Sequence, residues 1–365
     1  FTAPPRHRSE IESLSARFGL ALHRIGHLTA ERSVLLLREA DGGLAKATLE
    51  ALEAARALGG VLIAGLVGAS VEAAANSIAG CGASKILGVA GEAFGESRYS
   101  TDAAAAEAIA QAANATVIVA AHTSRWARAL PGVAQRLGAA VDTHVAALSA
   151  DLKATRWYYR QRIEGVIERA ARPRVILLDS GCAPAYAGAP GAAAVELVNV
   201  EITPALQRTR VIGKQAPKAE QQTIRPDAAI LFVAGAGWTK KQKDGQTHVA
   251  DAGKLILDFI GSANSSLGSS KSLVDLSGEG QAVLPFLSHL NQVGQTGSTP
   301  RHPKGLATCC HGEEPHVVGW RFIKERRAVN LDANCGWARG KADVLYVADA
   351  FAVIAKVNEL LKAKS

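Results

Sequence analysis

The sequence predicts an α/β protein with two domains, each built on a parallel β-sheet that helices cover on both faces. The chain has 365 residues, and a chain of this length usually forms more than one domain because single domains run to ~100–200 residues. Its first half alternates short apolar runs with Ala- and Leu-rich helical stretches, and a second such series begins near residue 227. Repeated alternation of strand and helix is typical of parallel sheets joined by right-handed crossovers.

The first domain is predicted over residues 31–212, and short runs rich in valine, isoleucine and leucine indicate its buried strands. These strands are expected at 33–37, 61–67, 85–89 and 116–121. Helices are expected at 44–58, from Ser70, at 102–113 and at 125–137, with Thr101 or Asp102 as the cap of the third helix. Strands at 163–167, 174–178 and 195–200 follow without helices between them and form a β extension, whereas the Gly/Ala/Pro-rich stretch 183–193 is expected to be a loop.

The second domain is predicted over residues 227–365, after an N-terminal arm at 1–30 and a polar linker at 213–226. Its strands are expected at 228–233, 305–310, 328–330 and 344–347, and its helices at 249–260 and 349–361. Gly235 and Gly237 follow the first of these strands, as in a dinucleotide-binding fingerprint. Lys240 stands where that fingerprint has its third glycine, so the motif is a weak indication of NAD binding and fits a plain strand-to-helix turn equally.

Composition excludes several classes of function. No apolar run approaches the about 20 residues of a membrane span, so no membrane insertion is expected. The net charge is +8, but aromatic residues make up only 5% of the chain, too few for a base-stacking surface, and no nucleic-acid partner is expected. The five cysteines include no CxxC pair, which favours free thiols in a reducing compartment over zinc or iron–sulfur ligation. The chain also lacks the GxSxG motif of a nucleophile elbow.

Glycine-rich and polar segments interrupt the apolar pattern of the second domain. The motif Val293-Gly294-Gln295-Thr296-Gly297 has two glycines that let the backbone approach a ligand, with a hydroxyl between them. Small hydroxyl residues at 265–270 precede Lys271, a combination suited to a phosphate or an electron-rich ring edge, although a surface loop explains it as well. His311 and His316 do not have the i, i+4 spacing of a helical metal pair, but a histidine at a strand end can hydrogen-bond a cofactor carbonyl.

These segments resemble the C-terminal FAD domain of the electron transfer flavoprotein alpha-subunit family. The residues that carry the resemblance are VGQTG at 293–297, His316 followed by Gly319, Ala328-Val-Asn330, and the ending Ala342-Asp343 with Val347-Ala-Asp349-Ala-Phe351. The stretch 120–137 is similar to the family's N-terminal domain, so the resemblance covers about residues 30–365. It implies two Rossmann-like domains, of which the C-terminal one binds FAD.

The resemblance also implies which residues contact the cofactor. Thr296 would bond near flavin N5, His316 would lie near O2, Asn330 would bind further along the cofactor, and Asp349 with Ala350 would lie near the adenosine part. The full implied set is Ser270, Lys271, Val293, Gly294, Gln295, Thr296, Gly297, His311, Gly312, Pro315, His316, Asn330, Asp349 and Ala350. The chain departs from the family pattern where Lys271 replaces an arginine, where 234–237 lacks the family's arginine, and where His311 and Pro315 replace serine and glutamine.

The implied function is that of an electron carrier and not of a substrate-converting enzyme by itself. With an electron transfer flavoprotein beta subunit, the chain would accept electrons from a flavin dehydrogenase and pass them to a downstream acceptor. An alternative is a flavin-binding structural subunit of a larger amine- or acyl-substrate dehydrogenase complex, and a third is an NAD-linked enzyme. High alanine and glycine content without a clear transit peptide favours the bacterial cytoplasm over a mitochondrial matrix.

Overall fold

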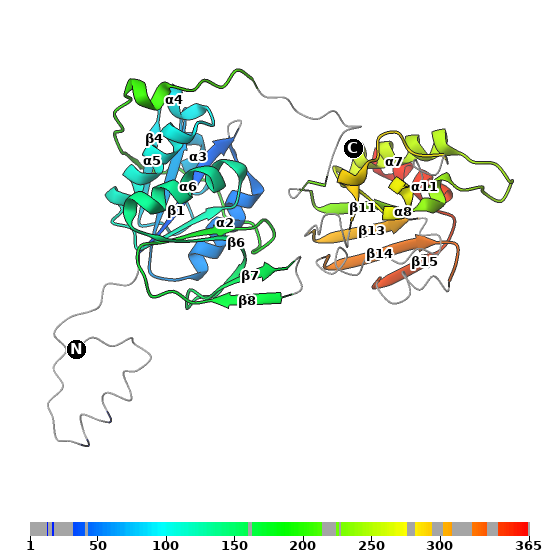
Figure 1. The fold of residues 1–365 in the computed structure, drawn as a ribbon, viewed down its shortest axis with the longest axis horizontal. Helices are drawn as coiled ribbons and strands as arrows, with labels where there is room; N and C mark the ends of the chain where they lie inside the picture. The colour runs from blue at the N-terminus through cyan, green and yellow to red at the C-terminus, as the bar shows by residue number, and fades with distance from the viewer. Residues whose placement is uncertain are drawn as a thin grey trace.

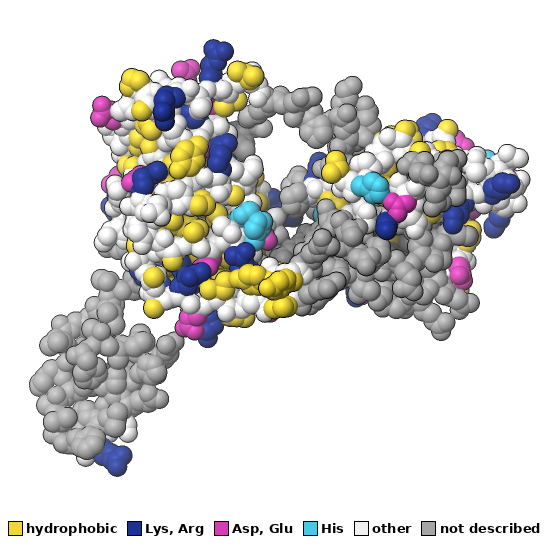
Figure 2. Space-filling model, in the orientation of Figure 1, with side chains coloured by type: hydrophobic (Ala, Val, Ile, Leu, Met, Phe, Trp, Pro, Cys, Tyr) yellow, Lys and Arg dark blue, Asp and Glu magenta, His cyan; other side chains and the backbone are white. Residues whose placement is uncertain are grey.

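The computed structural model describes most of the two predicted domains (Figures 1 and 2). The described residues are 13, 17, 32–40 (backbone only), 43–159, 163–213, 224–225, 228–275, 282–293, 302–308, 323–333 and 342–363. They form two separate β-sheets, one made from residues 32–197 and the other from residues 230–347. The predicted parallel α/β class is therefore confirmed, whereas the predicted domain boundaries stay predictions.

The N-terminal sheet runs in the order β10-β4-β3-β1-β5-β9-β6-β7-β8 (Figure 1). All neighbours from β10 to β6 pair in parallel, and β7 and β8 continue the sheet as an antiparallel extension. The strands are β1 (Arg32–Ala40), β2 (Gly43–Leu44, paired with β1), β3 (Val61–Gly68), β4 (Lys85–Ala90), β5 (Val117–Ala121), β6 (Ala140–Leu148), β7 (Ala154–Tyr158), β8 (Ile163–Ile167), β9 (Arg174–Leu178) and β10 (Val195–Leu197).

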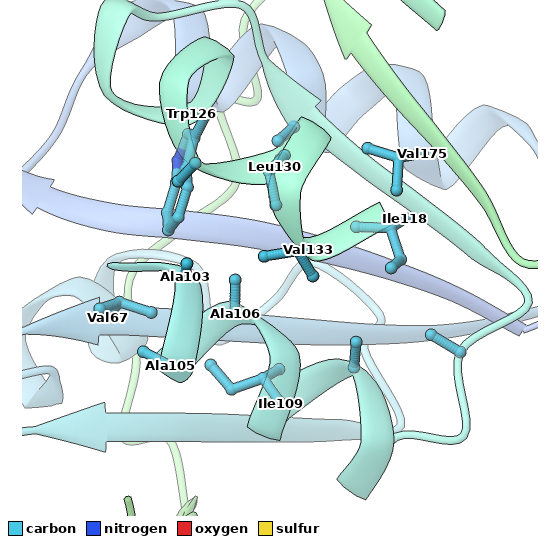
Figure 3. Close-up of a cluster of buried hydrophobic side chains, with 14 of the residues drawn as sticks. Val67, Ala103, Ala105, Ala106, Ile109, Ile118, Trp126, Leu130, Val133 and Val175 are labelled. Atoms are coloured by element: carbon cyan, nitrogen blue, oxygen red, sulfur yellow. The ribbon is translucent and has the colours of Figure 1, made fainter. Parts of the chain in front are cut away.

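Helices cover both faces of this sheet, as predicted. They are α2 (Lys46–Ala57), α3 (Glu72–Ser77), α4 (Glu92–Gly95), α5 (Tyr99–Ala112) and α6 (Ser124–Leu137), with a short 3-10 helix η2 (Pro204–Gln207). Successive side chains of a strand point to opposite faces, so Ile118 of β5 packs under α5 and α6 while Val119 faces α2 and α3. Figure 3 shows Trp126 and Val133 of α6 pointing towards α5 and the sheet.

A buried ion pair joins the parallel part of the sheet to its antiparallel extension. Arg174 of β9 is 0% exposed and donates from Nε to Oδ2 of Asp142 on β6 at 2.9 Å. It also donates to the carbonyl of Leu152, which precedes β7, at 2.5 Å. Arg169 contacts both carboxylate oxygens of Asp142 at 3.0 Å. Burial by itself raises the pKa of Asp142, but the two guanidinium groups outweigh it and hold this pKa below its usual value.

One prediction for this domain is wrong, and two of its strands were not predicted. Helix α5 begins at Tyr99 with Arg98 as its N-cap residue, so neither Thr101 nor Asp102 caps it. Asp102 lies inside the first turn because its buried carboxylate pairs with Arg125 of α6. Strands β6 and β7 were not expected, because polar residues and a register shift in β6 interrupt the apolar pattern. Tertiary pairing outweighs local preference at both places.

The C-terminal sheet runs in the order β12-β11-β13-β14-β15, and all its strands are parallel. The strands are β11 (Ile230–Ala234), β12 (Ser266–Ser269), β13 (Lys304–Thr308), β14 (Glu325–Asn330) and β15 (Val344–Val347). The helices are α7 (Val249–Ala263), α8 (Lys271–Asp275) and α11 (Ala350–Lys362), with 3-10 helices η4 (Ala236–Thr239) and η6 (His289–Asn291). None of the helices in the described part of the chain combines the length and apolarity needed to cross a bilayer.

One face of the C-terminal sheet carries α7 and α11, which pack on Phe232, Leu267 and Val329. Trp238 of η4 is fully buried there; its indole N–H donates to Thr308 Oγ1 at 2.8 Å and its ring lies 4.6 Å from that of Phe351. The opposite face carries a smaller apolar cluster around Leu231, Val233, Val293, Ala307, Ile323 and Ala328. Helices on both faces are therefore seen for the N-terminal sheet, whereas the described residues of the C-terminal domain contribute helices to one face.

In this domain the structure decides between the alternatives that the sequence left open at two places. The hydroxyl-rich stretch 265–271 is not a surface loop, because Ser266–Ser269 form the buried strand β12 beside β11. This stretch is therefore part of the sheet. Gly235 and Gly237 lead into the 3-10 helix η4, and this helix ends at Thr239, well before α7 begins. That geometry differs from the glycine turn that opens directly into an α-helix in a dinucleotide fingerprint.

Candidate functional site

The order of strands in the C-terminal sheet indicates where a ligand would bind. Counted along the chain, the strands lie in the order 2-1-3-4-5, so the direction of winding reverses between β11 and β13. In open α/β sheets, ligands bind outside the carboxyl ends of the strands at such a reversal. The candidate site is therefore the edge of the sheet where β12, β11, β13, β14 and β15 end.

Ser270 and Lys271 lie at this edge, directly after β12. The N–H of Ser270 donates to the carbonyl of Ala234, the last residue of β11, at 2.9 Å. Its hydroxyl accepts from the N–H of Leu273 at 3.2 Å and so holds the first turn of α8. The Lys271 side chain is 51% exposed, and its ammonium lies 3.8 Å from Oδ2 of Asp275. Lys271 therefore offers a cation to solvent at the carboxyl edge, with one carboxylate near it.

The glycine motif starts beside these two residues. The N–H of Val293 donates to the carbonyl of Ser269 at 3.0 Å, and Gln292 forms a bridge with Ser269. Val293 also packs against Gly268; a Cβ atom there would lie only 2.7 Å from Val293 Cγ2. Although 23 positions separate Ser270 from Val293 in the sequence, the structure brings the ends of the two segments together through Ser269.

The other described candidates lie at the ends of β14 and β15. Asn330 is the last residue of β14 and is 7% exposed; its carbonyl accepts from the N–H of Ala348 at 3.1 Å. Asp349 caps α11, since its Oδ1 accepts from the N–H of Phe351 at 2.8 Å. Ala350 is buried against the apolar cluster under α11. These three residues share one edge with Ser270, Lys271 and Val293, so six of the predicted residues lie at this edge of the sheet.

The remaining predicted residues lie outside the described part of the chain. They are Gly294, Gln295, Thr296, Gly297, His311, Gly312, Pro315 and His316. Their proposed contacts with the cofactor stay predictions, as do those of the six described residues.

A second polar cluster lies in the N-terminal domain and was not predicted from the sequence. It consists of His122 directly after β5, His144 within β6 and Asp179 directly after β9. Burial lowers the pKa of His122, and the neighbouring His144 lowers it further, whereas Asp179 acts in the opposite direction. Two of the three residues directly follow apolar strands, which is the signal that could have found them, but the pairing of β9 between β5 and β6 cannot be read from the sequence.

Comparisons with known proteins agree with both halves of the architecture. Residues 33–205 match the family described as electron transfer flavoprotein domain. A protein of Syntrophomonas wolfei subsp. wolfei, named electron transfer flavoprotein subunit alpha, is 29% identical over 339 residues, which span 90% of this chain and 98% of that protein. The first match lies in the N-terminal domain, and the second covers 90% of the chain and so includes much of the C-terminal domain as well. The chain is therefore similar to an electron transfer flavoprotein alpha subunit over most of its length, and its N-terminal domain matches the electron transfer flavoprotein domain family.

Proposed function

We propose that this chain binds FAD at the carboxyl edge of its C-terminal sheet and, with a beta subunit, carries electrons from a flavin dehydrogenase to a downstream acceptor. The observation that carries the proposal is the gathering of Ser270, Lys271, Val293, Asn330, Asp349 and Ala350 along that one edge. The free, buried thiol of Cys81 suits a reducing compartment, for which we propose the bacterial cytoplasm.

The chemistry at this edge suits a large ligand that forms hydrogen bonds. Ser269 is the last residue of β12, and its buried hydroxyl has no hydrogen-bond partner among the described residues. Buried polar groups normally have partners, so this hydroxyl is free to bond a ligand or one of the predicted contact residues. Lys271 adds a cation, and the backbone around Gly268 and Val293 is packed closely enough to fix where the glycine motif starts.

Bound FAD would supply the redox chemistry, and the residues of this chain would supply its position and its electrostatic surroundings. Lys271 would stabilise the negative charge that reduction places on the ring, because a nearby cation favours developing anionic charge. Asp275 would weaken that effect, since its carboxylate lies 3.8 Å from the Lys271 ammonium. In the predicted arrangement Thr296 and His316 would donate hydrogen bonds to the ring, and Asn330 would position the remainder of the cofactor.

The Lys271→Ala variant is expected to have a more negative flavin midpoint potential. Loss of one charge-assisted contact destabilises the reduced flavin by ~1–3 kcal/mol. Because Lys271 is half-exposed, we expect the lower end of this range, which corresponds to a shift of the midpoint potential by ~20 mV for a two-electron reduction. An anaerobic redox titration of the heterodimer measures the shift. Asp275→Asn should shift the potential in the positive direction, and Lys254→Ala, an exposed lysine in α7, should leave it unchanged. Equal flavin midpoint potentials in the unaltered protein and the three variants would show that Lys271 does not act on the flavin.

Reduction by a partner enzyme tests the carrier role itself. The heterodimer would be mixed anaerobically with a flavin dehydrogenase and that enzyme's substrate, and its visible flavin absorbance would be followed. Bleaching that requires both the dehydrogenase and its substrate supports the proposal. Bleaching by NADH alone would contradict it and support the NAD-linked alternative.

The departures from the family pattern favour one second candidate, a flavin-binding subunit fixed within a larger amine- or acyl-substrate dehydrogenase complex. Where the family carries an arginine after the first strand of this domain, the chain has Gly237, between the buried residues Ala236 and Trp238. Co-purification separates the two roles. A stable stoichiometric complex with a dehydrogenase supports the second candidate, and a free heterodimer that serves several acceptors excludes it.

A further inference from the structure

Three side chains of the metal-binding types meet at the carboxyl edge of the N-terminal sheet. His122 and Asp179 directly follow the neighbouring strands β5 and β9, and His144 lies in β6, the next strand of the sheet. Parallel strands end at one edge of their sheet, which is why residues far apart in the sequence come together here. This edge belongs to the domain that does not hold the proposed flavin site, so the cluster stands independently of the proposed function.

Backbone hydrogen bonds fix the three positions relative to one another. The N–H of His122 donates to the carbonyl of Leu178 at 2.7 Å, and the N–H of Asp179 donates to the carbonyl of Val145 at 2.9 Å. The three residues are therefore attached to a continuous hydrogen-bonded ladder that runs across β5, β9 and β6. A backbone that such hydrogen bonds hold in place before an ion binds loses less entropy on binding.

His144 is held in place by an irregular backbone. The register of β6 against β9 shifts between Asp142 and Val145, and His144 has φ of 54°. A residue with a side chain rarely adopts this left-handed conformation, and such strain concentrates at functional sites. Bulges of this kind redirect a side chain that a regular strand would point elsewhere. The bulge in β6 brings the imidazole of His144 to Asp179.

The ligand atoms are close enough to share one ion. Nδ1 of His144 lies 3.1 Å from Oδ1 of Asp179, Nδ1 of His122 lies 3.9 Å from the same oxygen, and the two ring centroids are 3.8 Å apart. One ligand atom from each residue lies within 4.8 Å of the others. Ligands of a tetrahedral ion bound at about 2.0–2.1 Å are about 3.3 Å apart, so small side-chain rotations complete the site.

We propose that His122, His144 and Asp179 bind a divalent transition-metal ion. Two imidazole nitrogens and one carboxylate oxygen suit Zn²⁺, Fe²⁺, Co²⁺ or Ni²⁺, whereas Mg²⁺ and Ca²⁺ prefer oxygen ligands throughout. Arg156 of β7 also acts electrostatically on His122. The positive charge of Arg156 opposes the binding of a cation that is attracted by the Asp179 carboxylate alone. The imidazole nitrogens must therefore supply most of the affinity for the metal ion.

The site is open on one side. The side chains of His122 and Asp179 are 16% and 25% exposed, whereas that of His144 is 62% exposed. Figure 2 shows histidine beside an acidic side chain on the surface of the N-terminal domain. Three protein ligands leave at least one coordination position for water or a small anion, as in open metal sites and unlike closed structural ones. The ion would therefore be accessible to exchange and to an exogenous ligand.

Calorimetric titration of the untagged full-length chain with Zn²⁺, after chelator treatment and dialysis, tests the proposal. The unaltered chain is expected to bind one equivalent of Zn²⁺. The His144→Asn and Asp179→Asn variants are each expected to bind Zn²⁺ at least ~10-fold more weakly. Asparagine suits the first variant because it tolerates the left-handed backbone of residue 144 and lacks the imidazole. His289→Asn is the matched control, since His289 is an exposed histidine beside a single carboxylate, that of Asp275 at 3.6 Å.

Metal analysis of the dialysed proteins and anomalous scattering from a zinc-soaked crystal give independent readouts. The proposal predicts an anomalous peak between His122, His144 and Asp179, with His289→Asn retaining the full stoichiometry. If either ligand variant does not fold, His122→Gln supplies the second test. Equal zinc stoichiometry and affinity in the unaltered chain and in a folded ligand variant would overturn the proposal, because the three residues would then form only a hydrogen-bonded cluster.

Discussion

Replacing Arg174 with alanine is expected to destabilise the N-terminal domain by about 3–5 kcal/mol, because removing one partner of a buried ion pair leaves the other charge without compensation. Arg174 is 0% exposed and Asp142 is 1% exposed, and the pair joins β9 to β6. The variant also loses the bond from Arg174 to the Leu152 carbonyl, which holds the turn before β7. Amide hydrogen exchange read separately for the two domains measures the change, since a two-domain chain need not unfold in one transition.

Lys85→Ala is the matched control. Lys85 of β4 pairs with Glu196 of β10 at 3.1 Å, so this ion pair also joins two strands of the N-terminal sheet, but its side chains are 58% and 61% exposed. Exposed pairs of this kind contribute ~0–1 kcal/mol. The account requires a large difference between the two variants, with faster exchange in β6, β7 and β9 for Arg174→Ala. Equal losses of stability in Arg174→Ala and Lys85→Ala would show that burial does not determine how much the Arg174–Asp142 pair contributes to stability.

Replacing Gly268 with alanine is expected to weaken both the C-terminal domain and the FAD binding proposed for it. The added Cβ would lie 2.7 Å from Val293 Cγ2 and 3.2 Å from Leu231 Cδ1, closer than van der Waals contact allows. Overpacking of this kind costs ~1–3 kcal/mol. Val293 precedes Gly294 and is bonded to the Ser269 carbonyl, so its displacement also moves the start of the glycine motif. Thermal unfolding and the flavin content of the purified heterodimer give the two readouts.

Gly261→Ala separates a local effect from a general one. Gly261 lies in α7, where an added Cβ would meet no atom within 4 Å. Alanine in a helix is favoured over glycine by ~1 kcal/mol, so this variant should be as stable as the unaltered chain or more stable, with full flavin content. If Gly268→Ala also kept full flavin content despite a measured loss of stability, the start of the motif at Val293 would not position the cofactor.

Much of the fold follows from the sequence where a strand is buried on both faces. The runs at β3, β5 and β9 are continuous apolar segments, and such runs specify central parallel strands without reference to distant residues. The closing helix was predicted at 349–361 and is found at Ala350–Lys362, with Asp349 as its cap. In these elements the local pattern and the tertiary structure agree.

The unpredicted elements depend on contacts between distant residues. Asp102 looks like a helix cap in the sequence, but its pairing with Arg125 places it inside α5. The hydroxyl residues of β12 look like a loop, but the strand beside β11 buries them. The cluster of His122, His144 and Asp179 requires both the order of three strands and a bulge, neither of which is encoded in a local pattern.

The candidate flavin site falls between these cases. Asn330 and Asp349 lie at the ends of strands that the sequence predicts, whereas Ser270 follows a strand that the sequence did not predict. All three were chosen from the family resemblance. What the sequence could not supply is the order β12-β11-β13-β14-β15, which places those ends along one edge. The bond from Val293 to the Ser269 carbonyl was likewise invisible, although it ties the glycine motif to Ser270.

The most direct test of the central claim is the visible spectrum and FAD content of this chain co-purified with its beta subunit. If the carboxyl edge of the C-terminal sheet binds the cofactor as proposed, the heterodimer is yellow and releases FAD in equimolar amount on denaturation. A stable, folded heterodimer that is colourless, and that takes up no FAD when the cofactor is added, would contradict it.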